Sequence, residues 1–277
     1  MPLLDELLGR GKSGPLAIPV AASTPVALRV YYTPGYPPLL PEDLRARAAT
    51  WVANHVDEPL RAALTPVVAS GALSYTDVAK TAFPPPLDLL LKAEVGEEER
   101  TRFERAWQVV VVSSDAKPQV PMFGLWAAVA AARSAALELK GALFDSPAVR
   151  LTPIASYEER IPGNGALRVT DHVAFPVDTD PSGLVRWHTT GMSKFGLPDV
   201  VIPAPPGPDQ GPLLRALAQH LLDTLLRANH GLPEPLSQLV FPADTTLPMA
   251  DGPAVLRLQL APSQGGGIPT LVALPPA

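Results

Sequence analysis

Apolar and polar residues recur with the period of a helix in three long stretches of the chain. Between Gly211 and Asn229, leucines return every three or four residues on one side, and polar side chains occupy the other. Phe123–Lys140 is unusually rich in alanine, so we expect a helix that lies close against a sheet and is capped by Gly141. A third helix, of about 15 residues, is expected from Pro41, whose fixed φ suits a first helical turn.

Short runs of β-branched and aromatic residues predict the strands. Trp107–Val112 is continuously apolar after its first two residues, a pattern typical of a strand buried on both faces. Turn residues bound the other predicted strands, which are Val26–Tyr32, Ala142–Asp145, Ala166–Phe175, Leu184–Thr190, Val200–Ile202, Val255–Leu260 and Ile268–Leu274. Some of these strands follow one another through short connectors and others alternate with helices. The pattern therefore favours an α+β fold, with a mixed or mainly antiparallel sheet packed by the Ala-rich helix and the Leu-striped helix, over a doubly wound sheet.

A domain boundary is expected in the stretch between Pro84 and Arg102, where prolines and charged residues interrupt the apolar pattern. We therefore divide the chain into a flexible N-terminal arm (residues 1–25), an N-terminal α+β subdomain (26–96) and a main α+β domain (97–277). A single domain that includes both of the last two parts is the alternative.

The charge balance narrows the classes of partner. Lys and Arg number 22 against 27 Asp and Glu, which gives a formal net charge of −5. No surplus of positive charge is available to neutralise nucleic-acid phosphates or an anionic membrane, so we expect neither as a partner. Hydrophobic residues make up 47% of the chain, which is enough to form a core. We interpret the 35 prolines as residues that end or interrupt the helices and strands of a folded protein.

The absence of cysteine excludes disulfides, thiolate metal sites and thiol nucleophiles. Asp5 and Glu6 lie where a secretory signal needs positive charge. The longest mostly apolar stretch, Val120–Ala132, is shorter than the roughly 20 residues of a membrane span. We therefore expect a cytoplasmic protein without a transmembrane helix.

The sequence gives only weak signals for a nucleotide-binding site or a metal site. The segment 9–14 contains the Gly-Lys-Ser that ends a phosphate-binding P-loop, but the full spacing requires a glycine where Glu6 stands and a preceding strand. No pair of histidines has the His-x-x-x-His or His-x-His spacing that supplies two metal ligands from one element. The five histidines are His55, His172, His188, His220 and His230. No cofactor and no metal site is predicted.

The most unusual local sequence is residues 187–200, which places an indole, an imidazole, a thioether and a phenyl ring in one strand–turn–strand unit. One interpretation is a hairpin whose large side chains fill the core, because aromatic and Met side chains are usually buried. The other is an exposed edge that docks a partner, because these residue types dominate protein interfaces. The candidate partner-binding residues are Trp187, His188, Met192, Phe195 and Asp199. Docking requires Trp187, Met192 and Phe195 to be exposed.

The catalytic alternative is a hydrolase. His188, Ser193 and Asp199 supply the residue types of a nucleophilic triad, but the Gly-x-Ser-x-Gly elbow is absent because Phe195 stands in place of the second glycine. This alternative, or a metal site drawn from scattered histidines and carboxylates, requires a cleft in which the side chains converge. We assign no catalytic residue. A small-molecule binding module with an apolar pocket between sheet and helices is a third possibility.

The sequence Thr-Thr-Gly-Met-Ser-Lys-Phe-Gly-Leu-Pro-Asp at residues 189–199 follows a strand, the Ala-rich helix and Gly141–Asp145. Together these features, from about residue 103 to 227, resemble an uncharacterised bacterial domain family with the pattern Thr-x-Gly-Met-x-x-Phe-Gly-x-Pro-Asp/Glu. The chain departs from the usual pattern at Ala142, where the family has a second glycine, and at Asp199, where glutamate is usual. The resemblance implies a fold but no activity. A weaker likeness to bacterial suppressor-of-fused-like domains, through the Thr-x-Gly-Met-Ser turn, implies protein binding.

These observations favour a non-catalytic protein-interaction module of the accessory or immunity type, for instance one that neutralises a toxin. We expect another protein as its partner. The sequence leaves the identity of that partner and the oligomeric state open.

Overall fold

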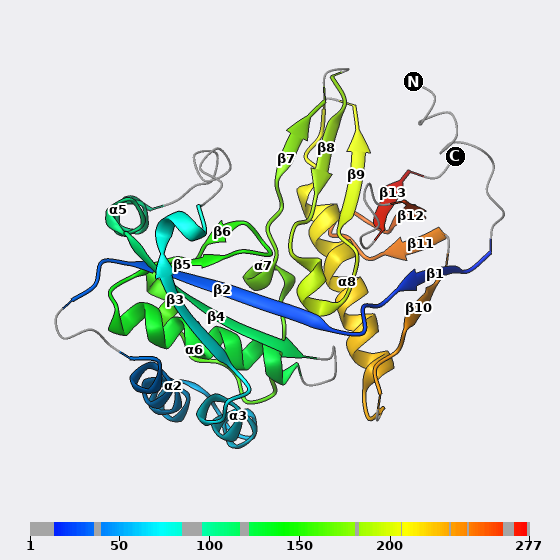
Figure 1. Cartoon of the computed structure of the whole chain (residues 1–277). Helices are drawn as coiled ribbons and strands as arrows, with labels where there is room; N and C mark the ends of the chain where they lie inside the picture. The colour runs from blue at the N-terminus through cyan, green and yellow to red at the C-terminus, as the bar shows by residue number, and fades with distance from the viewer. Residues whose placement is uncertain are drawn as a thin grey trace.

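A computed structural model describes residues 14–35, 40–84, 96–116, 122–180, 183–205, 207–232, 234–242, 244–262 and 269–275 of the chain. Within these ranges the fold is α+β, as predicted, with one antiparallel and one mixed sheet packed by helices (Figure 1). No helix among the described residues is both long enough and apolar enough to cross a membrane. The P-loop-like segment 9–14 and the first residues of the predicted arm lie outside these ranges, apart from Gly14.

The first sheet has five antiparallel strands in the order β3-β4-β2-β5-β6. The strands are β2 (Thr24–Tyr32), β3 (Ser74–Ala79), β4 (Gln108–Ala116), β5 (Ala142–Asp145) and β6 (Arg150–Leu151). Side chains alternate between the faces of a strand, so Val30 of β2 enters the main core while Tyr31 enters a second, smaller cluster on the opposite face.

Helix α6 (Phe123–Glu138) lies along one face of this sheet, and α2 (Pro41–His55) and α3 (Leu60–Ala69) pack against α6 (Figure 1). The alanines of α6 are almost all buried, and their small side chains allow the helix to approach the strands closely. Helix α5 (Glu97–Arg105) covers the other face, where Phe103 packs edge-on against Tyr31 with the ring centroids 4.7 Å apart.

The second sheet has six strands in the order β11-β12-β13-β9-β8-β7, and only the β13–β9 pair is parallel. Its strands are β7 (Val177–Thr179), β8 (Val185–His188), β9 (Val200–Ala204), β11 (Asp244–Leu247), β12 (Ala254–Ala261) and β13 (Thr270–Leu274). Helix α8 (Gly211–Asn229) buries its leucine stripe against this sheet, with the bounds that its sequence pattern predicts. The short strands β1 (Leu16–Pro19) and β10 (Gln238–Phe241) form a separate pair.

The predicted boundary at residue 96 falls inside the first sheet. Strand β2, from the predicted subdomain 26–96, lies between β4 and β5, which belong to the predicted main domain. One continuous cluster of buried hydrophobic residues runs from Ile18 to Ala273. Part of the predicted arm is also paired, since β1 binds β10. Non-local strand pairing therefore joins described segments from both sides of the expected boundary in one sheet and one core.

Several local expectations were wrong. Ala166–Phe175 contains a helical turn, α7 (Val169–His172), in place of a strand. The strands β1, β3, β6, β7, β10 and β11 were not predicted. The cap of α6 is also shifted. Lys140 adopts the left-handed conformation with φ of 50°, and the amides of Lys140 and Gly141 bind the carbonyls of Leu137 and Ala136. Gly141 serves close packing instead, because a Cβ there would lie 2.6 Å from Val30 Cγ1.

Candidate binding site

The predicted docking edge at residues 187–200 is largely buried. Met192 and Phe195 lie in the 3-10 helix η3 (Met192–Phe195) and have no exposed surface, and Trp187 is partly buried against the core. The prediction of an exposed aromatic edge at these residues is therefore wrong. The other interpretation is confirmed for Met192 and Phe195, because η3 packs beside β2 and inserts these side chains into the main core.

Hydrogen bonds explain why this segment has its unusual sequence. Asp199 Oδ1 accepts from Thr189 Oγ1 at 3.0 Å and from the amide of Met192 at 3.1 Å. Gly191 has φ of 112°, and a side chain there would meet Ala148 at 3.2 Å. Burial raises the pKa of Asp199, and the two donors oppose that shift. Asp199 therefore holds the turn together rather than facing a partner.

The triad of the hydrolase alternative is not assembled. His188 Nε2 lies 2.8 Å from Asp178 Oδ2, Asp199 binds the turn, and Ser193 is exposed. Within the described ranges, no hydrogen bond joins the side chain of Ser193 to either of the other two. Nor do the described residues contain any group of three or more His, Asp or Glu side chains placed to hold a metal ion.

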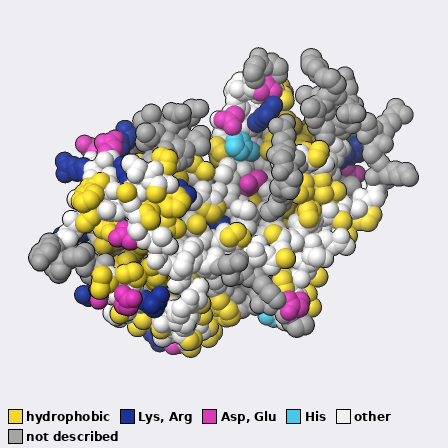
Figure 2. All heavy atoms as spheres, viewed as in Figure 1, with side chains coloured by type: hydrophobic (Ala, Val, Ile, Leu, Met, Phe, Trp, Pro, Cys, Tyr) yellow, Lys and Arg dark blue, Asp and Glu magenta, His cyan; other side chains and the backbone are white. Residues whose placement is uncertain are grey.

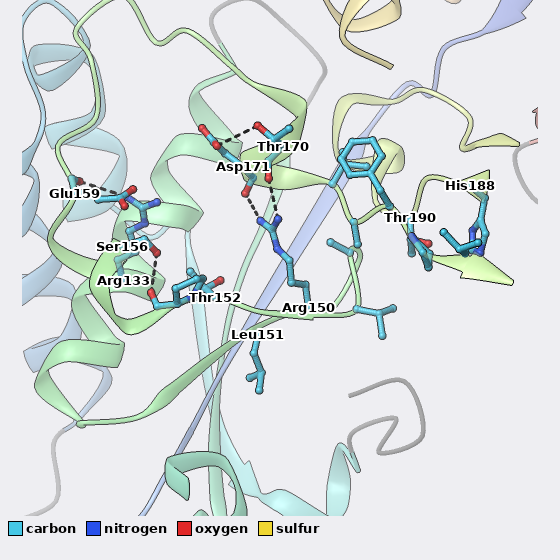
Figure 3. A pocket seen from close by; sticks show the side chains of 18 of the residues that line it. Arg133, Arg150, Leu151, Thr152, Ser156, Glu159, Thr170, Asp171, His188 and Thr190 are labelled. Carbon is cyan, nitrogen blue, oxygen red and sulfur yellow. Dashed lines mark hydrogen bonds between the residues drawn. The ribbon is translucent and has the colours of Figure 1, made fainter. Parts of the chain in front are cut away.

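A pocket of about 860 Å³ lies where the two sheets approach each other (Figure 3). One wall comes from α6, β6 and the segment after β6, and the other from α7, β7 and β8. Its polar lining residues include Arg133, Arg150, Glu159, Asp171, Asp178 and His188. Of the five residues that the sequence singled out as partner-binding candidates, His188 is the one that lines this pocket. The volume falls in the usual range of ligand pockets, roughly 300–1,000 Å³.

Arg150 is fixed in the pocket wall by backbone carbonyls. Its Nη1 donates to the carbonyl of Thr170 at 2.9 Å, and its Nη2 donates to the carbonyl of Asp171 (Figure 3). The buried Nε has no hydrogen-bond partner. Within the described ranges, no carboxylate forms an ion pair with this guanidinium group. Val149, directly before it, has φ of 52°, which is unusual for a β-branched residue and marks local strain.

Arg133 is the second cation of the pocket, and it projects from the otherwise uncharged middle of α6. Its Nη1 donates to the carbonyl of Glu159 at 3.3 Å. Burial lowers the pKa of Arg133, while the charges of Glu159 and Asp171 raise it. Neither carboxylate is within ion-pair distance of it, so the guanidinium charge is only partly compensated.

Two titratable groups lie buried behind the pocket. Lys194 forms an ion pair with Asp145, and His172 packs edge-on against Trp126 and Phe195 with an unpartnered Nε2. The pKa of His172 lies well below its ordinary value, first because of burial and then because of Lys194 and the nearby arginines, including Arg150. The interior behind the pocket therefore disfavours any further positive charge.

Both walls of the pocket include edge strands. The hydrogen bonds between Ala174 and Thr190, and from His188 to the carbonyl of Pro176, fix which residues of the first strand face β8. In this register Phe175, Val177 and Thr179 direct their backbone N–H and C=O groups away from β8. Within the described ranges these groups have no hydrogen-bond partner. Leu151 of β6 likewise directs its backbone groups away from β5, since Thr152 binds Leu143.

Most of these pocket residues were missed by the sequence analysis. One signal was available, because Arg133 is a charged residue in the middle of an alanine-rich stretch and a half-buried arginine there needs a reason. Arg150 and the edge of β7 gave no signal, since one arginine and a three-residue strand are common in any chain.

No model of a known protein family, no curated protein and no solved structure matches the chain. The resemblances to an uncharacterised bacterial domain family and to suppressor-of-fused-like domains stay predictions. The residues that carry the first resemblance, from Thr189 to Asp199, act in this structure as a hydrogen-bonded turn and as core side chains.

Proposed function

We propose that the protein is a non-catalytic protein-binding module and that an extended segment of its partner binds in the pocket, alongside β7. The observation that carries the proposal is the unpaired edge of this strand. Phe175, Val177 and Thr179 present N–H and C=O groups at alternate positions, the arrangement that a further strand needs for pairing. Edge strands of this kind bind extended peptides by adding a strand to the sheet.

The side chains around this edge favour a peptide. Val177 is 45% exposed and Phe175 lines the pocket, so an added strand would find apolar contacts next to main-chain hydrogen-bonding groups. The rest of the face shown in Figure 2 carries small separate groups of both charge signs rather than one large patch. This favours the pocket over a flat charged surface as the place of binding on that face.

A small molecule is the second candidate ligand, because the volume of the pocket suits one. Two sheet edges in one pocket are more readily explained by a peptide, because a small molecule has no need of main-chain groups at every second residue. A protein-binding role also agrees with what the likeness to suppressor-of-fused-like domains implies.

Selection from a library of random peptides, followed by measurement of the dissociation constants of the enriched peptides, tests the proposal. Val177→Pro removes the outward N–H of β7 without breaking a bond to β8. We expect Val177→Pro to weaken binding roughly tenfold, the effect of about one hydrogen bond. The control variant Val177→Thr keeps the N–H and should bind like the wild-type protein.

Equal binding by the Val177→Pro and Val177→Thr proteins would contradict strand addition at β7, provided that both variants melt like the wild type. Failure to enrich any peptide, together with binding of small anions or metabolite-sized compounds in a thermal-shift screen, would favour the small-molecule candidate.

A further inference from the structure

We infer that the segment bound in the pocket is acidic, and that Arg150, supported by Arg133, binds the carboxylate of one of its Asp or Glu side chains. This inference rests on the proposed function and adds the chemistry of the partner. It depends on which charged side chains line the pocket and on the ion pairs and hydrogen bonds that each of them already forms.

Among the residues that the structure describes, no carboxylate lies within ion-pair distance of either arginine of the pocket. Arg150 donates to the carbonyls of Thr170 and Asp171, and Arg133 donates to the carbonyl of Glu159. A carbonyl orients a guanidinium group but carries no full charge to compensate it. Arginine has five N–H donors, so each of these groups keeps donors available for a carboxylate.

The acidic side chains that line the pocket pair with residues other than the two arginines or face solvent. Asp171 binds Arg168 at 2.9 Å, and Asp178 binds His188 at 2.8 Å. Glu159 is exposed and therefore solvated. None of the three is placed within ion-pair distance of Arg133 or Arg150, so an incoming carboxylate meets no competitor from the described part of the chain at either guanidinium.

The interior next to the pocket adds to the preference for negative charge. His172, the buried last residue of α7, lies within reach of the charges of Lys194, Arg150, Arg133 and Arg168. Asp145 compensates Lys194 and Asp171 compensates Arg168, so the charges of Arg150 and Arg133 are the ones that repel a basic segment and attract an acidic one.

The geometry of Arg150 suits a planar carboxylate. Two backbone carbonyls of α7 hold the guanidinium group in place, so little side-chain freedom is lost when a ligand binds. Each terminal nitrogen carries two N–H groups and donates one of them to a carbonyl, so the others can donate charge-assisted hydrogen bonds to a carboxylate oxygen. An acidic side chain on a strand added at β7 lies next to this wall of the pocket, since Arg150 and Val177 line the same cavity.

A thermodynamic cycle on selected peptides tests the inference. Peptides that lose affinity for the Val177→Pro protein are resynthesised with each Asp or Glu replaced by Asn or Gln. For one acidic position, we expect the replacement to weaken binding to the wild-type protein roughly 10- to 100-fold. The same replacement should have little effect on binding to the Arg150→Gln protein, because the interaction is already absent there.

Two further variants control for indirect effects. Arg257→Gln removes an equal charge from the exposed pair with Asp244 on β11 and β12, away from the pocket, and should leave peptide affinity unchanged. Arg133→Gln serves as the second pocket variant if Arg150→Gln lowers the melting temperature. Raising the salt concentration should weaken binding of the acidic peptides to the wild-type protein more than to the Arg150→Gln protein.

Three outcomes overturn the inference. Selected peptides that depend on Val177 but contain no important acidic residue contradict the acidic partner while leaving strand addition intact. An equal effect of the acidic replacement in the wild-type and Arg150→Gln proteins contradicts the role of Arg150. Binding that requires a phosphorylated residue in place of Asp or Glu assigns the arginines to phosphate. A failure of the proposed function itself is recognised separately, by the absence of any peptide sensitive to Val177→Pro.

Discussion

The ion pair between Lys194 and Asp145 gives the sharpest test of how the two sheets are held together. Asp145 lies at the end of β5 in the first sheet, and Lys194 lies in η3, which leads into β9 of the second. The lysine side chain is 1% exposed and the aspartate side chain 8%. Asp145 Oδ1 also accepts the amide of Ala148 at 3.1 Å. Replacing either member of the pair leaves a charge that water cannot reach.

The magnitude follows from this burial. Removing one partner of a buried ion pair destabilises a protein by about 3–5 kcal/mol, because the remaining charge loses its compensation. Lys194→Met keeps the length of the side chain and leaves Asp145 with a single amide donor. Asp145→Asn keeps the acceptor for Ala148 and leaves the ammonium group unpaired. Burial lowers the pKa of Lys194 and Asp145 opposes this shift, so the ammonium form depends on the aspartate.

Urea unfolding followed by circular dichroism measures the free energy of unfolding of the two single variants and of the double variant. We expect each single variant to lose about 3–5 kcal/mol. In thermal melts this loss corresponds to about 6–10 °C for a chain of this length. The double variant should lose much less than the sum, because no unpaired charge remains. In the exposed pair, Arg257→Met and Asp244→Asn should each cost less than about 1 kcal/mol.

Two results would refute this reasoning. The first is a loss below about 1 kcal/mol in both single variants, which would place the pair in the range of exposed ion pairs. The second is strict additivity in the double variant, which would mean that the two side chains stabilise the protein independently.

Further predictions concern a helix end and a buried histidine. Lys140→Gly should raise the free energy of unfolding by about 1 kcal/mol in urea titrations, because Lys140 is exposed and holds a left-handed conformation that glycine adopts freely. The neighbouring Gly141→Ala should instead lower it, because the new Cβ would meet Tyr31 O at 2.8 Å, and the opposite order of the two variants would refute the assignment of this cap. His172 is neutral in the folded state, since its pKa is lowered well below 6.5. As the pH falls below about 6.5 the unfolded state gains a proton that the folded state does not, so stability should fall by up to about 1.4 kcal/mol per pH unit. His172→Phe should remove this part of the pH dependence, and identical pH profiles for both proteins would contradict it.

The local elements could be predicted from the sequence because their signals are local. The leucine stripe of α8 repeats with the helical period, so its limits followed directly from residues 211–229. The strands β2 and β4 were equally visible, because β-branched and aromatic residues follow one another between turn residues. Strand β3 could not be predicted, because its sequence lacks such a local signal. It is a mostly exposed edge strand, so no apolar pattern marks it.

The candidate site could not be predicted in the same way. The aromatic segment 187–200 had two interpretations, and only the contact of η3 with β2 decided that Met192 and Phe195 fill the core. Arg133 interrupts the apolar middle of α6, but nothing in the sequence placed it near Arg150 or His188. These three residues belong to α6, β6 and β8, which the fold brings to one cavity.

The sequence by itself determined the longer helices and several of the strands, which of their faces are apolar, and the excess of acidic over basic residues. Only the tertiary structure decided which helix packs against which face of each sheet. It paired β2 with strands from beyond the expected domain boundary, joined Lys194 to Asp145 across 49 positions, and left β6 and β7 as edges of one pocket. The physical reason is that periodicity specifies that a side chain is buried, whereas its neighbours depend on contacts between distant segments that no local pattern encodes.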